Sequence, residues 1–101
     1  MSKISVPIPR KKISEFCQRW KVVEFSLFGS ILRVDFHPGS DVDVLVTFAP
    51  DAQVSLFDMV KMPIELKAIF ERDVDLVEKA SLRNPYRRRE ILQTAERIYA
   101  S

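Results

Sequence analysis

The sequence has little cysteine, glycine and histidine, and it has no long apolar run. A single cysteine, Cys17, excludes an internal disulfide and is typical of a reducing compartment. His37 has no second histidine or cysteine at ligand spacing, so we interpret it as a loop residue. No window approaches the roughly 18 apolar residues of a membrane span, and no apolar signal-peptide core follows Lys3. We therefore expect a cytoplasmic protein with no membrane partner.

The excess of charge of one sign is also small. Sixteen Lys and Arg against fourteen Asp and Glu give a net charge of +2, too small a bias to indicate nucleic-acid binding. We do not expect direct nucleic-acid binding. The 101 residues, 47% of them hydrophobic, predict a single domain over 1–101 with one core and no separate substrate domain. A few loops, or another chain, must then recognise the substrate.

The first half of the chain shows one helical and two alternating patterns. Apolar residues at i, i+3, i+4 and i+7 predict a helix over 10–20. Period-2 alternation predicts a strand that ends at Phe28 and a second strand over 42–48. The stretch 34–40 between them has the composition of a loop.

The second half predicts two helices around a short strand. Ser55 and Asp58 resemble a capping box, and the helix that follows reaches about residue 72, with a kink at Pro63 or a split into two shorter helices. A strand follows over 74–77. Asn84 as N-cap begins a last helix, and its predicted apolar face comprises Ile91, Leu92, Ala95, Ile98 and Tyr99. The fold class is α+β, with a small mixed sheet of about three strands flanked by helices.

Acidic residues occur inside two of these apolar strands. Asp43 and Asp75 are each flanked by aliphatic residues, although Asp is depleted in strands and costly to bury unpaired. Asp41 lies two residues before Asp43, so both carboxylates face one side of the strand, roughly 6.5 to 7 Å apart. If the strand over 74–77 pairs beside them, Asp75 joins the same site. Three hard oxygen ligands suit Mg²⁺ or Mn²⁺.

A magnesium site of this kind also requires residues that bind the phosphates of a substrate. Magnesium usually binds a few carboxylates together with substrate phosphates, and two ions can clamp the attacking and leaving oxygens of an in-line displacement. Gly29 and Ser30 directly follow a strand. A glycine lets the backbone approach a phosphate closely, and the serine offers a hydroxyl and an amide. The residues together predict a nucleotide site.

These residues carry a resemblance to a known family. The segments 27–30, 41–43 and 74–77, with ten residues between the first two, resemble the signature of the nucleotidyltransferases of the DNA polymerase beta fold. More narrowly, the chain is similar to the minimal nucleotidyltransferases (MNT proteins), which share its size and an ending like the segment 82–86. The resemblance extends over about residues 22–99 and implies their fold.

The resemblance assigns phosphate binding to the turn. It implies that Gly29 and Ser30 hold the triphosphate of ATP and that Arg33 contacts a phosphate, a task suited to a bidentate guanidinium. The chain departs from many members in two places. Ile31 and Val34 stand where those members have a basic residue and a glycine.

The resemblance assigns the metal site to the acids. It implies that Asp41 and Asp43 bind two Mg²⁺ ions, or Mn²⁺, and that Asp75 completes this site and helps to activate the acceptor hydroxyl. Asp73 is the competing third acid, and we favour Asp75 because it lies inside the apolar run. Taken alone, Asp41 would also suit a turn.

The function implied by the MNT resemblance is transfer of AMP from ATP to a tyrosine of a HEPN-domain ribonuclease toxin, with this chain as the antitoxin. One alternative is a catalytically silent antitoxin that covers the toxin sterically. A transferase acting on RNA or a small molecule is a third hypothesis. The basic run 87–89 is either a solvated helix start or, because cations oppose the dipole there, a hint of a phosphate-bearing or acidic partner.

Overall fold

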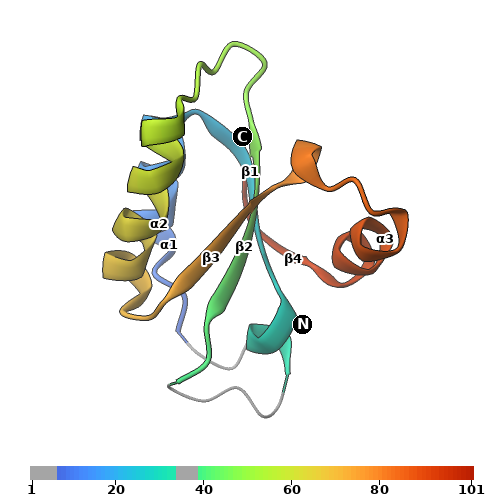
Figure 1. Cartoon of the computed structure of the whole chain (residues 1–101). Coiled ribbons are helices and arrows are strands. Elements are labelled where there is room, and N and C mark those ends of the chain that lie inside the picture. The colour runs from blue at the N-terminus through green and yellow to red at the C-terminus, as the bar shows by residue number, and fades with distance from the viewer. Residues whose placement is uncertain (1–6, 34–38) are drawn as a thin grey trace.

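A computed structural model describes residues 7–33 and 39–101, which form a four-stranded sheet with helices on both faces (Figure 1). The elements in chain order are α1 (Arg10–Trp20), β1 (Val22–Phe28), the 3₁₀ helix η1 (Gly29–Leu32), β2 (Val42–Phe48), α2 (Leu56–Phe70), β3 (Val74–Glu78), the 3₁₀ helix η2 (Lys79–Ser81), α3 (Pro85–Thr94) and β4 (Glu96–Ala100). The α+β class and the mixed sheet are confirmed. Val34 and His37, and most of the predicted loop 34–40, lie outside the described residues.

The sheet has the order β3-β2-β1-β4. β1 pairs antiparallel with both β2 and β4, whereas β2 and β3 are parallel. A parallel pair needs a crossover, and α2 provides it. In Figure 1, α1 and α2 cover one face of the sheet and α3 lies on the other.

Helix α1 confirms the helix predicted over 10–20. Ile13, Phe16 and Cys17 are fully buried against the sheet. Lys21 adopts the left-handed conformation at φ 57° and donates its backbone N–H to the Cys17 carbonyl, which ends the helix. Burial raises the pKa of the Cys17 thiol to about 12, so this side chain serves packing.

Helix α2 begins with the predicted capping box and passes Pro63 as one helix. The Ser55 hydroxyl accepts the backbone N–H of Asp58, and the Asp58 carboxylate accepts the backbone N–H of Ser55. A proline removes only one backbone donor. Met62 and Leu66, both buried, hold the helix on the sheet next to this position, so two shorter helices do not form.

The predicted C-terminal helix is too long. Helix α3 ends at Thr94, and the residues from Glu96 to Ala100 form β4, so the helical interpretation of Ala95, Ile98 and Tyr99 was wrong. Apolar residues seven and eight positions after Ile91 fit a helical face, but they also fit a strand beside β1. Without β4, β1 would be an edge strand with unpaired backbone N–H and C=O groups. Pairing with β4 satisfies these groups, and this stabilisation favours a strand over a helix for the segment.

Two apolar clusters sandwich the sheet. The larger one, under α1 and α2, includes Val42, Val44 and Val46 from alternate positions of β2. The smaller one, under α3, comprises Phe28, Leu45, Leu82 and Ile91. Side chains at positions 41, 43 and 45 therefore face α3. No helix within residues 7–33 and 39–101 is long and apolar enough to cross a membrane.

Candidate active site

The turn after β1 is built around a glycine. Gly29 has φ +74°, a conformation that L side chains rarely adopt. A Cβ built on Gly29 would lie 3.1 Å from Cγ of Asp43 and closer still to its Oδ2. The absence of a side chain at position 29 thus lets η1 lie directly against the Asp43 carboxylate.

Ser30 connects this turn to the start of β2. Its hydroxyl donates to the backbone carbonyl of Asp41, at 3.0 Å, and its backbone N–H donates to the Asp43 carboxylate. The sequence predicted that Ser30 would hold a phosphate. In the structure, both of its polar groups position the two acids, and phosphate binding by Ser30 stays a prediction.

The strand register brings the third acid to the same place. Asp75 lies opposite Asp43 in the parallel β2–β3 pair, where neighbouring strands are about 4.8 Å apart. The backbone N–H of Val42 donates to the carbonyl of Asp73, at 2.9 Å, and fixes the starts of the two strands. Because Val74 and Leu76 pack toward α1 and α2, Asp75 faces α3 together with Asp43.

The pKa of Asp43 reflects the charges that surround it. Partial burial is the largest cause that raises the pKa of its carboxyl, and the negative charges of Asp75 and Asp41 raise it further. The hydrogen bond from Ser30 and the positive charge of Arg87 act in the opposite direction. Three carboxylates and one guanidinium therefore interact at this end of the sheet.

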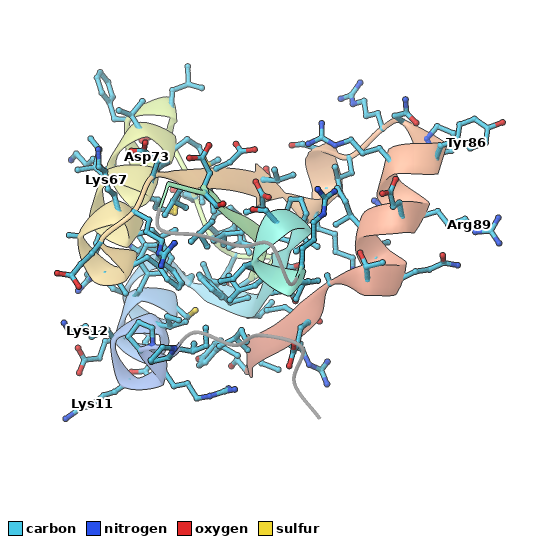
Figure 2. All side chains as sticks on the ribbon, turned by 90° about the horizontal axis from the view of Figure 1, so that it is seen from below. Lys11, Lys12, Lys67, Asp73, Tyr86 and Arg89 are labelled. Atoms are coloured by element: carbon cyan, nitrogen blue, oxygen red, sulfur yellow. The ribbon has the colours of Figure 1, made fainter. Side chains whose placement is uncertain are left out.

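Asp73, the competing third acid, has a different partner. Its carboxylate forms an ion pair with Lys67 of α2, at 2.9 Å, at the junction between α2 and β3 (Figure 2). The acids whose charges raise the pKa of Asp43 are Asp75 and Asp41, and not Asp73. The geometry thus supports the choice of Asp75 over Asp73.

The donor set suits a hard cation. Carboxylate oxygens are the ligands that Mg²⁺ and Mn²⁺ prefer, and a cation would offset the mutual repulsion of the three acids. Among the described residues, no group of three or more acids, histidines or cysteines is gathered closely enough to hold a metal by itself. Mg²⁺ commonly takes one or two carboxylates and completes its shell with water and substrate phosphates, which fits this open arrangement.

Arg87 is a residue of the site that the sequence alone does not identify. The basic run 87–89 indicated a phosphate-bearing or acidic partner. It did not indicate which of the three arginines lies near the acids. Arg88 Nη1 donates to the carbonyl of Lys79, at 3.1 Å, and anchors α3 to η2. Arg89 points away from the sheet in Figure 2. Only the tertiary structure shows that the charge of Arg87 acts on Asp43.

The other residues of the turn have separate positions. Ile31, where many MNT proteins have a basic residue, is buried in the larger cluster and packs instead of facing solvent. Arg33 ends η1, with its backbone N–H on the Ser30 carbonyl at 2.9 Å, and its side chain is exposed. A phosphate contact by Arg33 stays a prediction.

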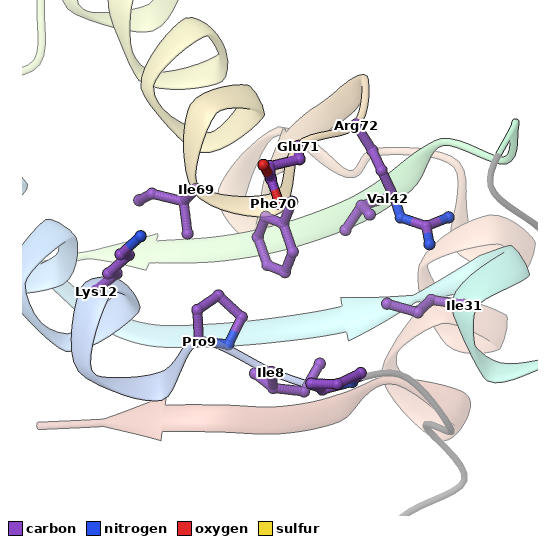
Figure 3. Close-up of a pocket in the computed structure, with 10 residues that line it drawn as sticks. Ile8, Pro9, Lys12, Ile31, Val42, Ile69, Phe70, Glu71 and Arg72 are labelled. Carbon is purple, nitrogen blue, oxygen red and sulfur yellow. The ribbon is translucent and has the colours of Figure 1, made fainter.

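A pocket of about 430 Å³ opens near the turn, between the start of α1 and the end of α2. Figure 3 shows its lining, which includes Phe70, Ile31 and Val42. Val42 points to the face opposite that of Asp43, so this pocket lies behind the acids. We assign no part of the site to it.

Carboxylates on neighbouring strands, beside a tight Gly-Ser turn and an arginine, are typical of sites that bind phosphates together with a cation. Comparison with known proteins specifies the class. The model of the nucleotidyltransferase domain family matches residues 9–98, and the chain belongs to this family.

Three known proteins are similar to the chain in sequence or in fold. The protein adenylyltransferase MntA of Thermococcus cleftensis is 37% identical over 70 residues, which are 69% of each chain. A solved structure provisionally described as a minimal nucleotidyltransferase is 27% identical, with a TM-score of 0.73 and 95% of each chain covered. An MNT antitoxin in complex with the tri-AMPylated HEPN toxin of Shewanella oneidensis is 20% identical, with a TM-score of 0.66 over 91% of this chain and 70% of that one. The recognised resemblance to minimal nucleotidyltransferases is confirmed.

Proposed function

We propose that this chain transfers AMP from ATP to a tyrosine hydroxyl of a HEPN-domain toxin and thereby acts as its antitoxin. The observation that carries the proposal is the position of Asp43, held by the Ser30 amide and directly opposite Asp75. The name of the Thermococcus relative and the AMPylated toxin in the Shewanella complex support the choice of reaction and partner.

The reaction is an in-line displacement at phosphorus. The tyrosine oxygen attacks the α-phosphorus of ATP, the bond from this phosphorus to the β-bridging oxygen breaks, and pyrophosphate leaves. A tyrosine hydroxyl has an ordinary pKa of about 10, so it must lose its proton during the attack. Asp75 lies on the exposed side of the strand pair and is the carboxylate that we assign to accept this proton.

The remaining residues bind and orient the nucleotide. The Gly29 turn lets phosphate oxygens approach the backbone, and the guanidinium groups of Arg87 and Arg33 offset their negative charge. Asp41 and Asp43 would hold Mg²⁺ or Mn²⁺, which supplies charge neutralisation of the phosphates and a lower pKa for a bound hydroxyl. Asp43 is the most buried of the three acids.

A labelling experiment tests the proposal. The purified chain is incubated with ATP labelled at the α-phosphate, Mg²⁺ and the HEPN-domain protein of the adjacent reading frame. We expect label on the HEPN protein, loss of labelling with Asp43→Asn, and loss with a Tyr→Phe substitution at the labelled position. Asp51→Asn, a change at an exposed acid far along the chain from the turn, is the matched control and should label normally.

Two other outcomes would contradict the proposal. If the wild-type chain leaves the HEPN protein unlabelled but neutralises it as well as Asp41→Asn/Asp43→Asn does, the chain is a silent binding antitoxin. If label appears on RNA or on a small molecule and not on protein, the acceptor class is wrong.

A further inference from the structure

The solvent-facing side of α2 carries an apolar stripe that the fold does not use. Leu56, Phe57, Val60 and Ile64 expose 86%, 79%, 63% and 66% of their surface. Phe57, Val60 and Ile64 are spaced i, i+3 and i+7, so their side chains form one line along the helix. We call these four residues the α2 stripe.

The α2 stripe is not needed to hold α2 in place. Met62 and Leu66, on the opposite side of the helix, are fully buried, and the capping box of Ser55 and Asp58 fixes its start. Single exposed apolar residues are normal on protein surfaces, but contiguous ones on one helix mark interaction sites. An exposed stripe of this kind is typical of a surface that binds another molecule.

The charges beside the α2 stripe identify the kind of molecule. Lys61 is exposed on one side of the line. Lys67, on the other side, already forms the ion pair with Asp73. The acids of α2 are already engaged, because Asp58 caps the helix and Glu65 accepts from Trp20 Nε1, at 2.8 Å, and pairs with Arg19. The stripe is thus apolar along its centre, and Lys61 gives one of its borders a positive charge.

A second copy of this chain fits that surface poorly. In a two-fold contact between antiparallel α2 helices, Phe57 would meet Ile64 of the other copy, and the two Lys61 side chains would lie near each other across the axis. Like charges at such positions disfavour pairing. An amphipathic helix with an apolar line and an acidic border would match both the apolar centre and Lys61.

The α2 stripe also lies away from the transfer site. α2 covers one face of the sheet, while Asp43 and Asp75 are on the face toward α3 (Figure 1). A helix docked on α2 would leave the acids open to ATP. Binding a partner and modifying it can then be separated by substitution.

We propose that the α2 stripe is the docking surface for an amphipathic, acid-bordered helix of the partner protein, separate from the carboxylate site. The proposal rests on the proposed function for the identity of this partner, the HEPN-domain toxin. It adds that the chain binds the toxin through α2, whether or not AMP transfer takes place.

Calorimetric titration with the HEPN-domain protein of the adjacent reading frame tests the α2 stripe. Val60→Asp/Ile64→Asp places two charges on exposed positions, so we expect an unchanged fold by circular dichroism, ATP binding as in wild type, and a Kd for the toxin raised at least tenfold. Lys61→Glu should raise this Kd several-fold, and more at low than at high salt. Gln93→Asp, on the exposed side of α3, is the matched control and should bind like wild type.

Three results would overturn the proposal. The first is a Kd for Val60→Asp/Ile64→Asp equal to that of wild type, or no complex with wild type at all. The second is a wild-type dimer in light scattering that these substitutions dissociate with the toxin affinity intact, which would assign the stripe to a second copy. The third is wild-type binding to anionic phospholipid vesicles that the double variant loses while toxin affinity is intact. The proposed function is tested by a different measurement, because it would be contradicted by the absence of label on the toxin.

Discussion

The carboxylate of Asp43 fills the space that a side chain at position 29 would occupy. Gly29 combines this close approach with φ +74°, so two independent reasons require glycine there. The contact joins the end of β1 to the start of β2, where Phe28 and Asp43 are paired. The acid that matters most to the proposed chemistry is thus positioned by the backbone of the turn.

Gly29→Ala should destabilise the protein and abolish transfer. The left-handed conformation alone costs about 1–2 kcal/mol for an L residue, and the new methyl group must displace the Asp43 carboxylate. Urea unfolding measures the stability. In the double variant Gly29→Ala/Asp43→Ala the steric conflict is gone, so the glycine substitution should cost less than it does with Asp43 present. If Gly29→Ala lowers the free energy of unfolding equally with and without Asp43, the predicted steric clash with the Asp43 carboxylate is wrong.

The pH dependence of stability should show the raised pKa of Asp43. Burial, and then the charges of Asp75 and Asp41, disfavour its ionised form in the folded state. At neutral pH the ionised carboxylate therefore destabilises the fold, and this penalty disappears as the pH falls through the raised pKa toward the ordinary aspartate range. Asp43→Asn should accordingly be more stable than wild type at neutral pH, with a difference that shrinks on acidification.

The measurement is metal-free urea unfolding of both proteins at several pH values. The control is the same series with excess Mg²⁺, in which a bound cation should favour the ionised carboxylate and reduce the advantage of Asp43→Asn. A stability difference that grows as the pH falls would contradict the assignment.

Asp75 and Asp73 offer a matched pair of substitutions. Asp75→Asn should reduce the rate of AMP transfer at least a hundredfold, the scale of a lost proton acceptor, and leave stability nearly unchanged. Asp73→Asn should keep transfer and lose only the exposed ion pair with Lys67, worth at most about 1 kcal/mol. Transfer rates and urea unfolding of both variants decide this. The reverse pattern would identify Asp73 as the third acid.

Arg87→Gln should weaken ATP binding and also move the acid limb of the pH–rate profile. Loss of a charged hydrogen bond to phosphate should raise the KM for ATP about tenfold. Because the positive charge of Arg87 lowers the pKa of Asp43, its removal should shift the loss of activity to higher pH. Arg89→Gln, whose side chain points away from the sheet, is the control. An unchanged KM with an unchanged profile would exclude Arg87 from the site.

Local patterns predicted most of the elements. The helix over 10–20, the strand over 42–48 and the Ser55 capping box were all confirmed, because period and capping depend on residues close in sequence. The C-terminal segment failed. Its apolar spacing suits both a helix and a strand, and only the open edge of β1 selects the strand.

The candidate site follows the same division. Alternation along β2 already put Asp41 and Asp43 on one face, and the apolar run around Asp75 favoured it over Asp73. The sequence could not show that Arg87 approaches Asp43, because three consecutive arginines on a helix point in three directions and only the docking of α3 decides which one faces the site.

The sequence by itself determined the local features: the glycine that the turn requires, the strand alternation and the helix start at Ser55. These depend on backbone sterics and on hydrogen bonds between near neighbours. The tertiary structure alone decided the parallel pairing that sets Asp75 against Asp43, the conversion of the chain end into β4, and the exposure of the α2 stripe. Each of these is a contact, or a missing contact, between segments far apart in the chain, whose free energy no local pattern contains.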